Sequence, residues 1–271
     1  MQTHPTIPVD ASRTRALSIA ATTWVVVALI GQLIFASYVA GFYGRAAMHG
    51  RWSAWNDVLA HGYVAGDTAL NVVLGLHLLF AVLVIVGGVM QLMPRIRRVA
   101  PAWHRWNGRL YLILSSTLAI GGVAMVWIRG TVGDIWQHLG ITLNAALIVG
   151  FAWLAWRAAR ERRFDAHRRW ALRLFLVVSG VWFFRVGLMF WIVVNQGPAG
   201  FDPTSFTGPF LTGLSFAQSL LPLAILEGYL RARASGRRVH VVGAFACLVL
   251  GTLVTGAGIA AASAIMWLPH L

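Results

Sequence analysis

Four of the nine histidines are spaced so that they could bind a metal cofactor. They fall one each on four successive apolar segments: His77, His104, His138 and His167. His77 precedes Arg95 by 18 residues, and His138 precedes Arg157 by 19 residues. At a helical rise of 1.5 Å per residue, both imidazoles are expected about 27 to 29 Å from the arginines that end their segments. The first and third histidines therefore share one predicted level.

The second and fourth histidines share another level. His104 lies ten residues beyond Pro94 and His167 lies ten residues beyond Arg157, and each is followed by an arginine and a long apolar run. In a bundle whose helices alternate in direction, diagonal helices face each other across the core. The spacing therefore predicts two facing pairs, His77 with His138 and His104 with His167, roughly 20 Å apart along the bundle.

Two facing imidazoles suit axial ligation of the iron of a planar porphyrin. A buried unpaired imidazole in lipid is costly, whereas a ligated one is satisfied. We therefore expect two haem b groups with these four histidines as iron ligands. For each histidine taken alone, contact with lipid phosphate or water at the membrane interface remains an alternative. Glycines near the same levels leave room for a ring, although Gly is also common in membrane helices: Gly87, Gly88, Gly121, Gly122, Gly150, Gly180 and Gly187.

A weak internal repeat supports this pairing. The order His77, Arg95 and His104-Arg105 is echoed by the order His138, Arg157 and His167-Arg168, with histidine separations of 27 and 29 residues. Duplication of a two-helix unit would place equivalent histidines at equivalent depth.

The segment from about His77 to Arg185 resembles the bacterial membrane family called domain of unknown function 2306. Two stretches carry the resemblance, Trp103 to Tyr111 (WHRWNGRLY) and Asp165 to Trp170 (DAHRRW). That family name implies no activity. The histidine layout is similar to the cytochrome b561 family, transmembrane dihaem reductases in which four consecutive helices each supply one ligand. The likeness covers about 110 of the 271 residues. This chain departs from that family in having seven apolar segments instead of six, no lysine and two further carboxyl-terminal helices.

Other charged residues in or near the apolar segments are candidate cofactor contacts. Several arginines crowd the second histidine level, where they could pair with haem propionates, bind a quinone-like reductant or simply set the membrane topology: Arg105, Arg109, Arg168, Arg169 and Arg173. Arg185 lies within an apolar segment and is expected to face the bundle, where it would neutralise a propionate, contact a quinol or pair with an acid. Glu227 is the only carboxylate inside an apolar segment and is expected to form an ion pair with Arg173.

The elements that must position these residues are membrane-spanning helices. Of the 271 residues, 58% are hydrophobic and 11% are charged, which excludes a water-soluble globule. Seven apolar segments are long enough to cross a ~30 Å hydrocarbon layer as helices: 16–41, 68–93, 110–128, 138–156, 170–194, 208–230 and 239–267. We therefore expect an all-α membrane protein with seven transmembrane helices in a single polytopic domain, 1–271. Within it, 68–194 would form a four-helix haem-binding core, and 208–267 would add two helices.

The arginines predict the orientation of the chain. The net charge of +14 comes from 22 arginines with no lysine, and eighteen of them fall in the amino-terminal segment and the alternate loops 94–109, 157–173 and 231–238. Because cationic loops stay in the cytoplasm, the amino terminus is expected inside a bacterial inner membrane and the carboxyl terminus outside. Arginines in short loops meet anionic lipid head groups, so the charge does not indicate nucleic-acid binding.

These observations predict a transmembrane dihaem cytochrome, an oxidoreductase that carries electrons from quinol or another small reductant to an acceptor on the outer side. A respiratory-chain protein is a candidate partner. The alternative is a non-enzymatic transporter or an assembly factor for a respiratory complex, whose histidines are interfacial or bind a metal. A transporter predicts a broken helix or a polar cavity at mid-membrane, whereas a haem protein predicts paired histidines facing a slot wide enough for porphyrin.

Overall fold

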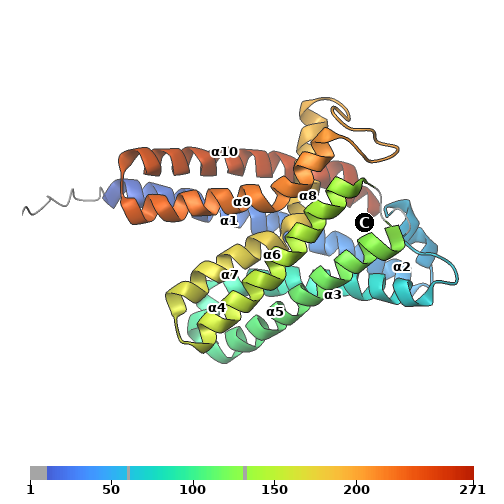
Figure 1. Ribbon diagram of the computed structural model, residues 1–271, viewed down its shortest axis with the longest axis horizontal. Helices are drawn as coiled ribbons and strands as arrows, with labels where there is room; N and C mark the ends of the chain where they lie inside the picture. Colours follow the sequence, from blue (N-terminus) through green and yellow to red (C-terminus); the bar gives the residue numbers. More distant parts are fainter. Residues whose placement is uncertain (1–10, 60–61, 131–132) are drawn as a thin grey trace, which may run out of the picture.

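The structure is a computed structural model that describes residues 11–59, 62–130 and 133–271. Within these ranges the chain is helical, and the only β pairing is an isolated bridge between Asp202 and Thr207. The helices are α1 (Ala11–Val39), η1 (Ala40–Gly44), α2 (Arg45–Met48), η2 (Trp52–Asp57), α3 (Thr68–Leu92), α4 (Pro94–Val99), α5 (Pro101–Ala124), η3 (Met125–Gly130), α6 (Ile135–Arg160), α7 (Phe164–Val178), α8 (Gly180–Val194), α9 (Pro209–Ser235), α10 (Arg238–Ala262), η4 (Ser263–Trp267) and η5 (Leu268–His270). Figure 1 shows their arrangement.

Six of these helical segments are long and apolar enough to cross a membrane, and the bent pair α7 and α8 makes a seventh if it is counted as one span. The prediction of an all-α, multi-pass membrane protein is therefore confirmed. The third segment begins earlier than its apolar run, at Pro101, because proline is accommodated in the first turn of a helix, where its missing N–H has no intrahelical partner.

Aspartates start the two helices that carry His77 and His138. The Asp67 carboxylate accepts a hydrogen bond from the Leu70 backbone N–H at 3.2 Å, and Asp134 accepts one from the Gln137 N–H at 3.0 Å. Both are N-caps, which satisfy a backbone donor that the first helical turn leaves without a partner. They fix where α3 and α6 begin, and hence how far along each helix its histidine lies.

The fifth predicted segment, 170–194, is broken at Ser179, where α7 and α8 meet at an angle of 51°. The Ser179 hydroxyl donates to the Phe175 carbonyl at 2.8 Å and accepts from Gln32 Nε2 of α1 at 2.9 Å. A serine that bonds the carbonyl of the preceding turn bends a helix, and the contact from α1 holds the bend. The fifth predicted segment is therefore a bent pair of helices that can still count as one membrane span.

The bend divides the fifth segment between two groups of helices. α7 packs against α6, whereas α8 packs against α10. One apolar cluster joins α3, α5, α6 and α7, with Val84, Leu114, Ile148 and Val177 among its buried members. We call these four helices the histidine bundle.

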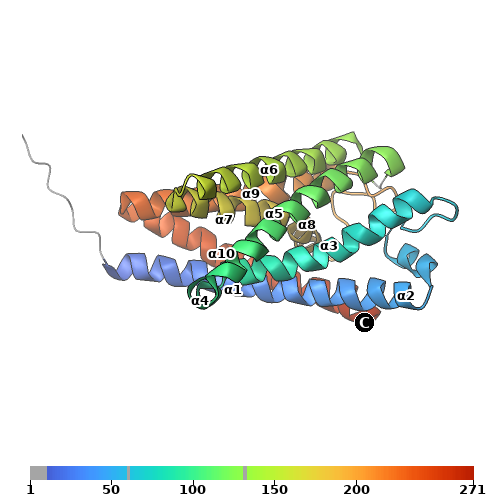
Figure 2. The ribbon, with the colours of Figure 1, turned by 90° about the horizontal axis from the view of Figure 1, so that it is seen from below.

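A second group consists of α1, α8, α9 and α10, with α1 and α8 both lying against α10. Figures 1 and 2 show α9, α10 and the first half of α1 running together. We call the end of the molecule that carries the arginine-rich turns 93–100, 160–163 and 235–238 the basic end, and the opposite end the far end. In Figure 1 the two groups diverge toward the basic end.

Candidate functional site

In the histidine pair near the basic end, one member, His167, is oriented in the way that metal-binding histidines are. Nδ1 of His167 lies 2.9 Å from the backbone carbonyl oxygen of Ala155 on α6. Because a carbonyl can only accept, Nδ1 carries the proton in this hydrogen bond, which leaves Nε2 as the nitrogen that would ligate a metal. A hydrogen bond from the other ring nitrogen to a backbone carbonyl is the usual way in which a protein orients a metal-binding imidazole.

The partner of this ring, His104, is held through its backbone. Gln91 Nε2 of α3 donates to the His104 carbonyl at 3.0 Å, while Nδ1 of the ring is buried without a hydrogen-bond partner. The His104 and His167 rings lie close enough to interact electrostatically. Within the described part of the chain, the two rings of the basic-end pair interact electrostatically, and Nδ1 of His104 is buried without a hydrogen-bond partner.

The far-end pair is arranged differently. The His77 ring packs opposite Gly122, where a Cβ would lie 3.7 Å from His77 Cε1. The His138 ring packs edge-to-face against Trp127, with ring centroids 5.7 Å apart, and its Nε2 is buried without a hydrogen-bond partner. His77 and His138 thus contact the chain at positions five residues apart, about 7 Å at the rise of a helix.

The helices that carry His77 and His138 end at different places relative to Arg95 and Arg157. The sequence spacing took Arg95 and Arg157 as equivalent helix ends, but α3 ends at Leu92 and Arg95 lies on the separate helix α4. α6 instead continues through Arg157 to Arg160. The two arginines are therefore not equivalent helix ends, and the shared level of His77 and His138 stays a prediction.

The predicted arginine contacts fall into three kinds. Arg173 forms an ion pair with Glu227 of α9, with Nε 2.7 Å from the carboxylate, as expected from their shared depth. Arg109 lies over the Trp106 ring, 5.1 Å from its centroid, and Arg105 and Arg168 are exposed at the basic end. Arg173 is thus engaged within the protein, whereas the other three have side chains free to meet head groups or propionates.

Arg185 faces the interior of the molecule, as expected. Its guanidinium lies over the Phe35 ring of α1, 5.4 Å from the centroid, and it is close enough to His77 to interact electrostatically. Arg185 donates a hydrogen bond to the Val181 carbonyl of its own helix, at 3.3 Å. Among the described residues it has no acidic partner, so the predicted ion pair with an acid is not formed there.

Most of the glycines near the histidine levels serve helix packing. Cβ atoms built at Gly87, Gly88, Gly180 and Gly187 would meet side chains of neighbouring helices at 3.0 to 3.1 Å. Gly121 and Gly150 have no such atom within 4 Å. Close approach of neighbouring helices therefore explains why four of these positions are glycine. Gly121 and Gly150 are the two positions where a larger group would meet no neighbouring atom within 4 Å.

Two structural features bear on what this arrangement can hold. In the part of the chain that the structure describes, no group of three or more His, Cys, Asp or Glu side chains could hold a metal ion. Axial ligation of a porphyrin iron needs only two protein ligands, so the histidine pairs are the relevant donor sets. A surface groove of about 430 Å³ lies along α1, lined by residues from Arg15 to Val27, and none of the four histidines lines it.

The sequence reasoning missed the residues around Arg185 and around the bend. Tyr38 and Tyr43 are near enough to Arg185 to interact with it electrostatically, and the Ser219 hydroxyl of α9 donates to Asn144 Oδ1 of α6 at 2.6 Å beside the bend. Single polar residues in apolar segments were the available signal, because such residues in a membrane face the protein interior. Their partners lie on distant segments, which no local pattern reveals.

No curated protein and no solved structure matches this chain. One family model does: residues 74–204, just under half of the chain, match the family described as "Predicted membrane protein (DUF2306)". The matched region holds all four histidines and Arg185, so the part of the chain that contains the histidine bundle is the part that is similar to the DUF2306 family of predicted membrane proteins.

Proposed function

We propose that this protein is a transmembrane b-type cytochrome that carries electrons through the membrane by two haems. The observation that carries the proposal is the basic-end pair. His167 has its Nδ1–H bound to Ala155, which leaves Nε2 to ligate a metal, and His104, close to it, has a buried nitrogen without a partner among the described residues. An imidazole oriented in this way is ready to ligate iron, and leaving it unligated in a membrane is costly.

The far-end pair, His77 and His138, is proposed as the second site. His138 contributes a buried Nε2 that lacks a partner, and His77 faces a glycine with a cation nearby. Bound haem would supply one-electron redox chemistry, and the protein would set its potential through ligand orientation and the apolar surroundings.

The electron donor that we propose is a quinol or another small reductant, and the acceptor lies on the other side of the membrane. The basic end would face the cytoplasm, where Arg105, Arg109 and Arg168 are exposed. Guanidinium groups there are suited to hold propionates or an anionic reductant. A respiratory-chain protein is a candidate partner for either transfer.

The test is a dithionite-reduced minus oxidised spectrum of the detergent-purified protein, with a pyridine haemochrome count of haem per chain. We expect sharp b-type bands and about two haems per chain. His104→Ala or His167→Ala should halve the count, whereas His240→Ala, at the basic end but bonded to Ser235, should leave it unchanged. A protein that stays colourless after expression with ample haem, yet elutes as a folded species, would refute the proposal.

A transporter is the second candidate, and the bend at Ser179 favours it. A broken helix near mid-membrane is the feature that many transporters use to bind substrate. Here the polar groups beside the bend bond one another, Gln32 with Ser179 and Asn144 with Ser219. The variant Gln32→Leu distinguishes the two candidates. In a cytochrome it should leave the haem content of the purified protein intact. In a transporter, which would contain no haem, it should impair uptake of the transported substrate into proteoliposomes.

A further inference from the structure

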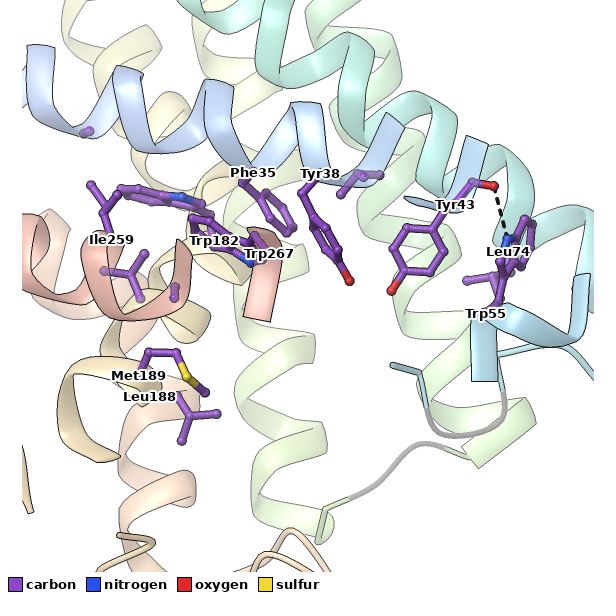
Figure 3. Close-up of a cluster of buried hydrophobic side chains, with 14 of the residues drawn as sticks. Phe35, Tyr38, Tyr43, Trp55, Leu74, Trp182, Leu188, Met189, Ile259 and Trp267 are labelled. Atoms are coloured by element: carbon purple, nitrogen blue, oxygen red, sulfur yellow. Dashed lines mark hydrogen bonds between the residues drawn. The ribbon is translucent and has the colours of Figure 1, made fainter. Parts of the chain in front are cut away.

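One buried cluster near the far end contains hydrogen-bond donors without acceptors. Among the residues that the structure describes, the indole N–H groups of Trp182 and Trp267 are buried without a hydrogen-bond partner, and the buried Tyr38 hydroxyl interacts only with the neighbouring hydroxyl of Tyr43. These four residues belong to a single apolar cluster formed by α1, α8, η4 and their neighbours. Figure 3 shows them around Phe35, with the Tyr38 and Tyr43 hydroxyls directed toward each other.

Arg185 adds a positive charge to this cluster. It lies over Phe35, whose ring is 5.3 Å from that of Trp267 and 6.2 Å from that of Tyr38. Arg185 also interacts electrostatically with the hydroxyls of Tyr38 and Tyr43. A guanidinium has five N–H donors. Among the described residues, Arg185 uses one of them, in a hydrogen bond to the Val181 carbonyl.

One type of ligand would satisfy both the positive charge of Arg185 and the buried hydrogen-bond donors near it. An unpaired cation within a membrane is expensive, and each buried donor without an acceptor adds a further cost. Neutral acceptors would satisfy the donors but would leave the charge. A carboxylate supplies both a negative charge and about four lone-pair positions, and it binds guanidinium in a bidentate geometry.

We infer that Arg185, together with Tyr38 and Tyr43, forms a carboxylate-binding site at the far end of the membrane region. Helices surround Arg185, yet part of its surface stays accessible, so a small group can reach it. The carboxylate comes from one of two sources, a free amphiphilic carboxylate such as a fatty acid or the propionate of a haem at the neighbouring His77. The inference does not depend on the proposed cytochrome function.

The first experiment titrates the haem-free protein in detergent with oleate, using oleyl alcohol as the uncharged control, and follows the shift in thermal unfolding temperature. Oleate should stabilise the wild-type protein and oleyl alcohol should not. Arg185→Gln should weaken oleate binding on the order of 10-fold or more, because a charge-assisted bidentate contact is lost. Tyr38→Phe should weaken it about 3-fold to 10-fold, the effect of one neutral hydrogen bond.

Two further variants guard the test against unspecific effects. Arg233→Gln removes an exposed basic-end arginine that lies over Tyr229, and it should bind oleate as the wild type does. Arg185→Lys keeps the charge but loses the bidentate geometry, so it should bind with intermediate affinity. If Arg185→Gln is too unstable to purify, the oleate affinities of Arg185→Lys and Tyr38→Phe still test the carboxylate site.

A second titration identifies the source of the carboxylate. Haem b is compared with its dimethyl ester, in which both propionates are blocked. If a propionate is the ligand, haem binds more tightly than the ester, and Arg185→Gln removes the difference. If oleate binds through Arg185 while no haem binds, the carboxylate site stands and the cytochrome proposal fails. If Arg185→Gln and Arg185→Lys bind oleate and both porphyrins as the wild type does, the inference is overturned.

Discussion

At the scale of single residues, the Arg173–Glu227 ion pair shows how a charge is accommodated in this protein. The pair joins α7 to α9, and the two side chains are 15% and 37% exposed. Arg173 also stacks over Trp170, 4.7 Å from the ring centroid. The pair could be predicted because both residues interrupt apolar segments at the same depth, where neither is tolerated alone.

Removing one member of this pair should therefore cost more than removing both. Glu227→Gln leaves the Arg173 cation without an acid and is expected to destabilise the protein by about 1–3 kcal/mol, a value reduced by the partial exposure of the pair. The double variant Arg173→Met/Glu227→Met should recover most of the loss. Thermal unfolding in detergent measures both, and a double variant that is less stable than Glu227→Gln would contradict this account.

Glu161, in the turn between α6 and α7, gives a pH-dependent prediction. Hydrogen bonds from Arg157 and Arg163 lower the pKa of its carboxyl below the ordinary value. Because the folded pKa is depressed, its contribution to stability is present above the unfolded pKa and disappears as the pH falls through the folded pKa. The unfolding temperatures of wild type and Glu161→Gln should therefore differ at neutral pH and converge under acidic conditions, below about pH 4. A difference that persists unchanged to low pH would rule this out.

At the scale of helices, small residues decide where the second group packs. A Cβ at Gly258 of α10 would lie 2.5 Å from the Val186 carbonyl oxygen of α8. That contact is too close for any side chain and involves backbone, which cannot move aside. The approach of α10 to α8 thus depends on this glycine.

Gly258→Ala should push α8 and α10 apart and destabilise the protein by about 1–3 kcal/mol. Gly256→Ala is the matched control on the same helix, because a Cβ there meets nothing within 4 Å. The control should be neutral or slightly stabilising, since Ala favours helix over Gly. Thermal unfolding compares the two, and equal effects would show that the α8–α10 approach is not limiting.

The helix scale is also where sequence reasoning reached its limit. The apolar segments and their approximate ends follow from local composition, and Pro101 marks the start of α5 in the sequence itself. The bend at Ser179 does not, because its second hydrogen-bond partner, Gln32, lies 147 residues away. Nor does the spacing show that Arg95 and Arg157 are not equivalent helix ends, since α3 ends before Arg95 while α6 continues past Arg157.

At the scale of the whole molecule, the arginine distribution predicts how the chain lies in the membrane. The basic end gathers the turns 93–100, 160–163 and 235–238, whereas the far end carries loop 195–208. Cationic turns remain in the cytoplasm, so the far end should face outward.

Single-cysteine labelling tests this orientation. With Cys247 replaced by Ser, a cysteine at exposed Ser205 in the far loop should react with a membrane-impermeant maleimide in intact cells. A cysteine at exposed Ser235, at the basic end, should react only after the cells are opened. The opposite pattern would invert the topology and would place the proposed quinol side on the other face of the membrane.

The sequence by itself determined that this is an all-α, multi-pass membrane protein, where its apolar helices lie and which histidines and arginines interrupt them. These properties follow from the local amino-acid composition and the hydrophobic periodicity, which can be read along a single stretch of chain. Only the tertiary structure decided that the fifth segment bends between two helix groups, that His167 is oriented by Ala155, and that Arg185 lies over Phe35 near Tyr38 and Tyr43. The physical reason is that each of these features arises from contacts between helices distant in sequence, whose relative placement depends on packing that no local pattern encodes.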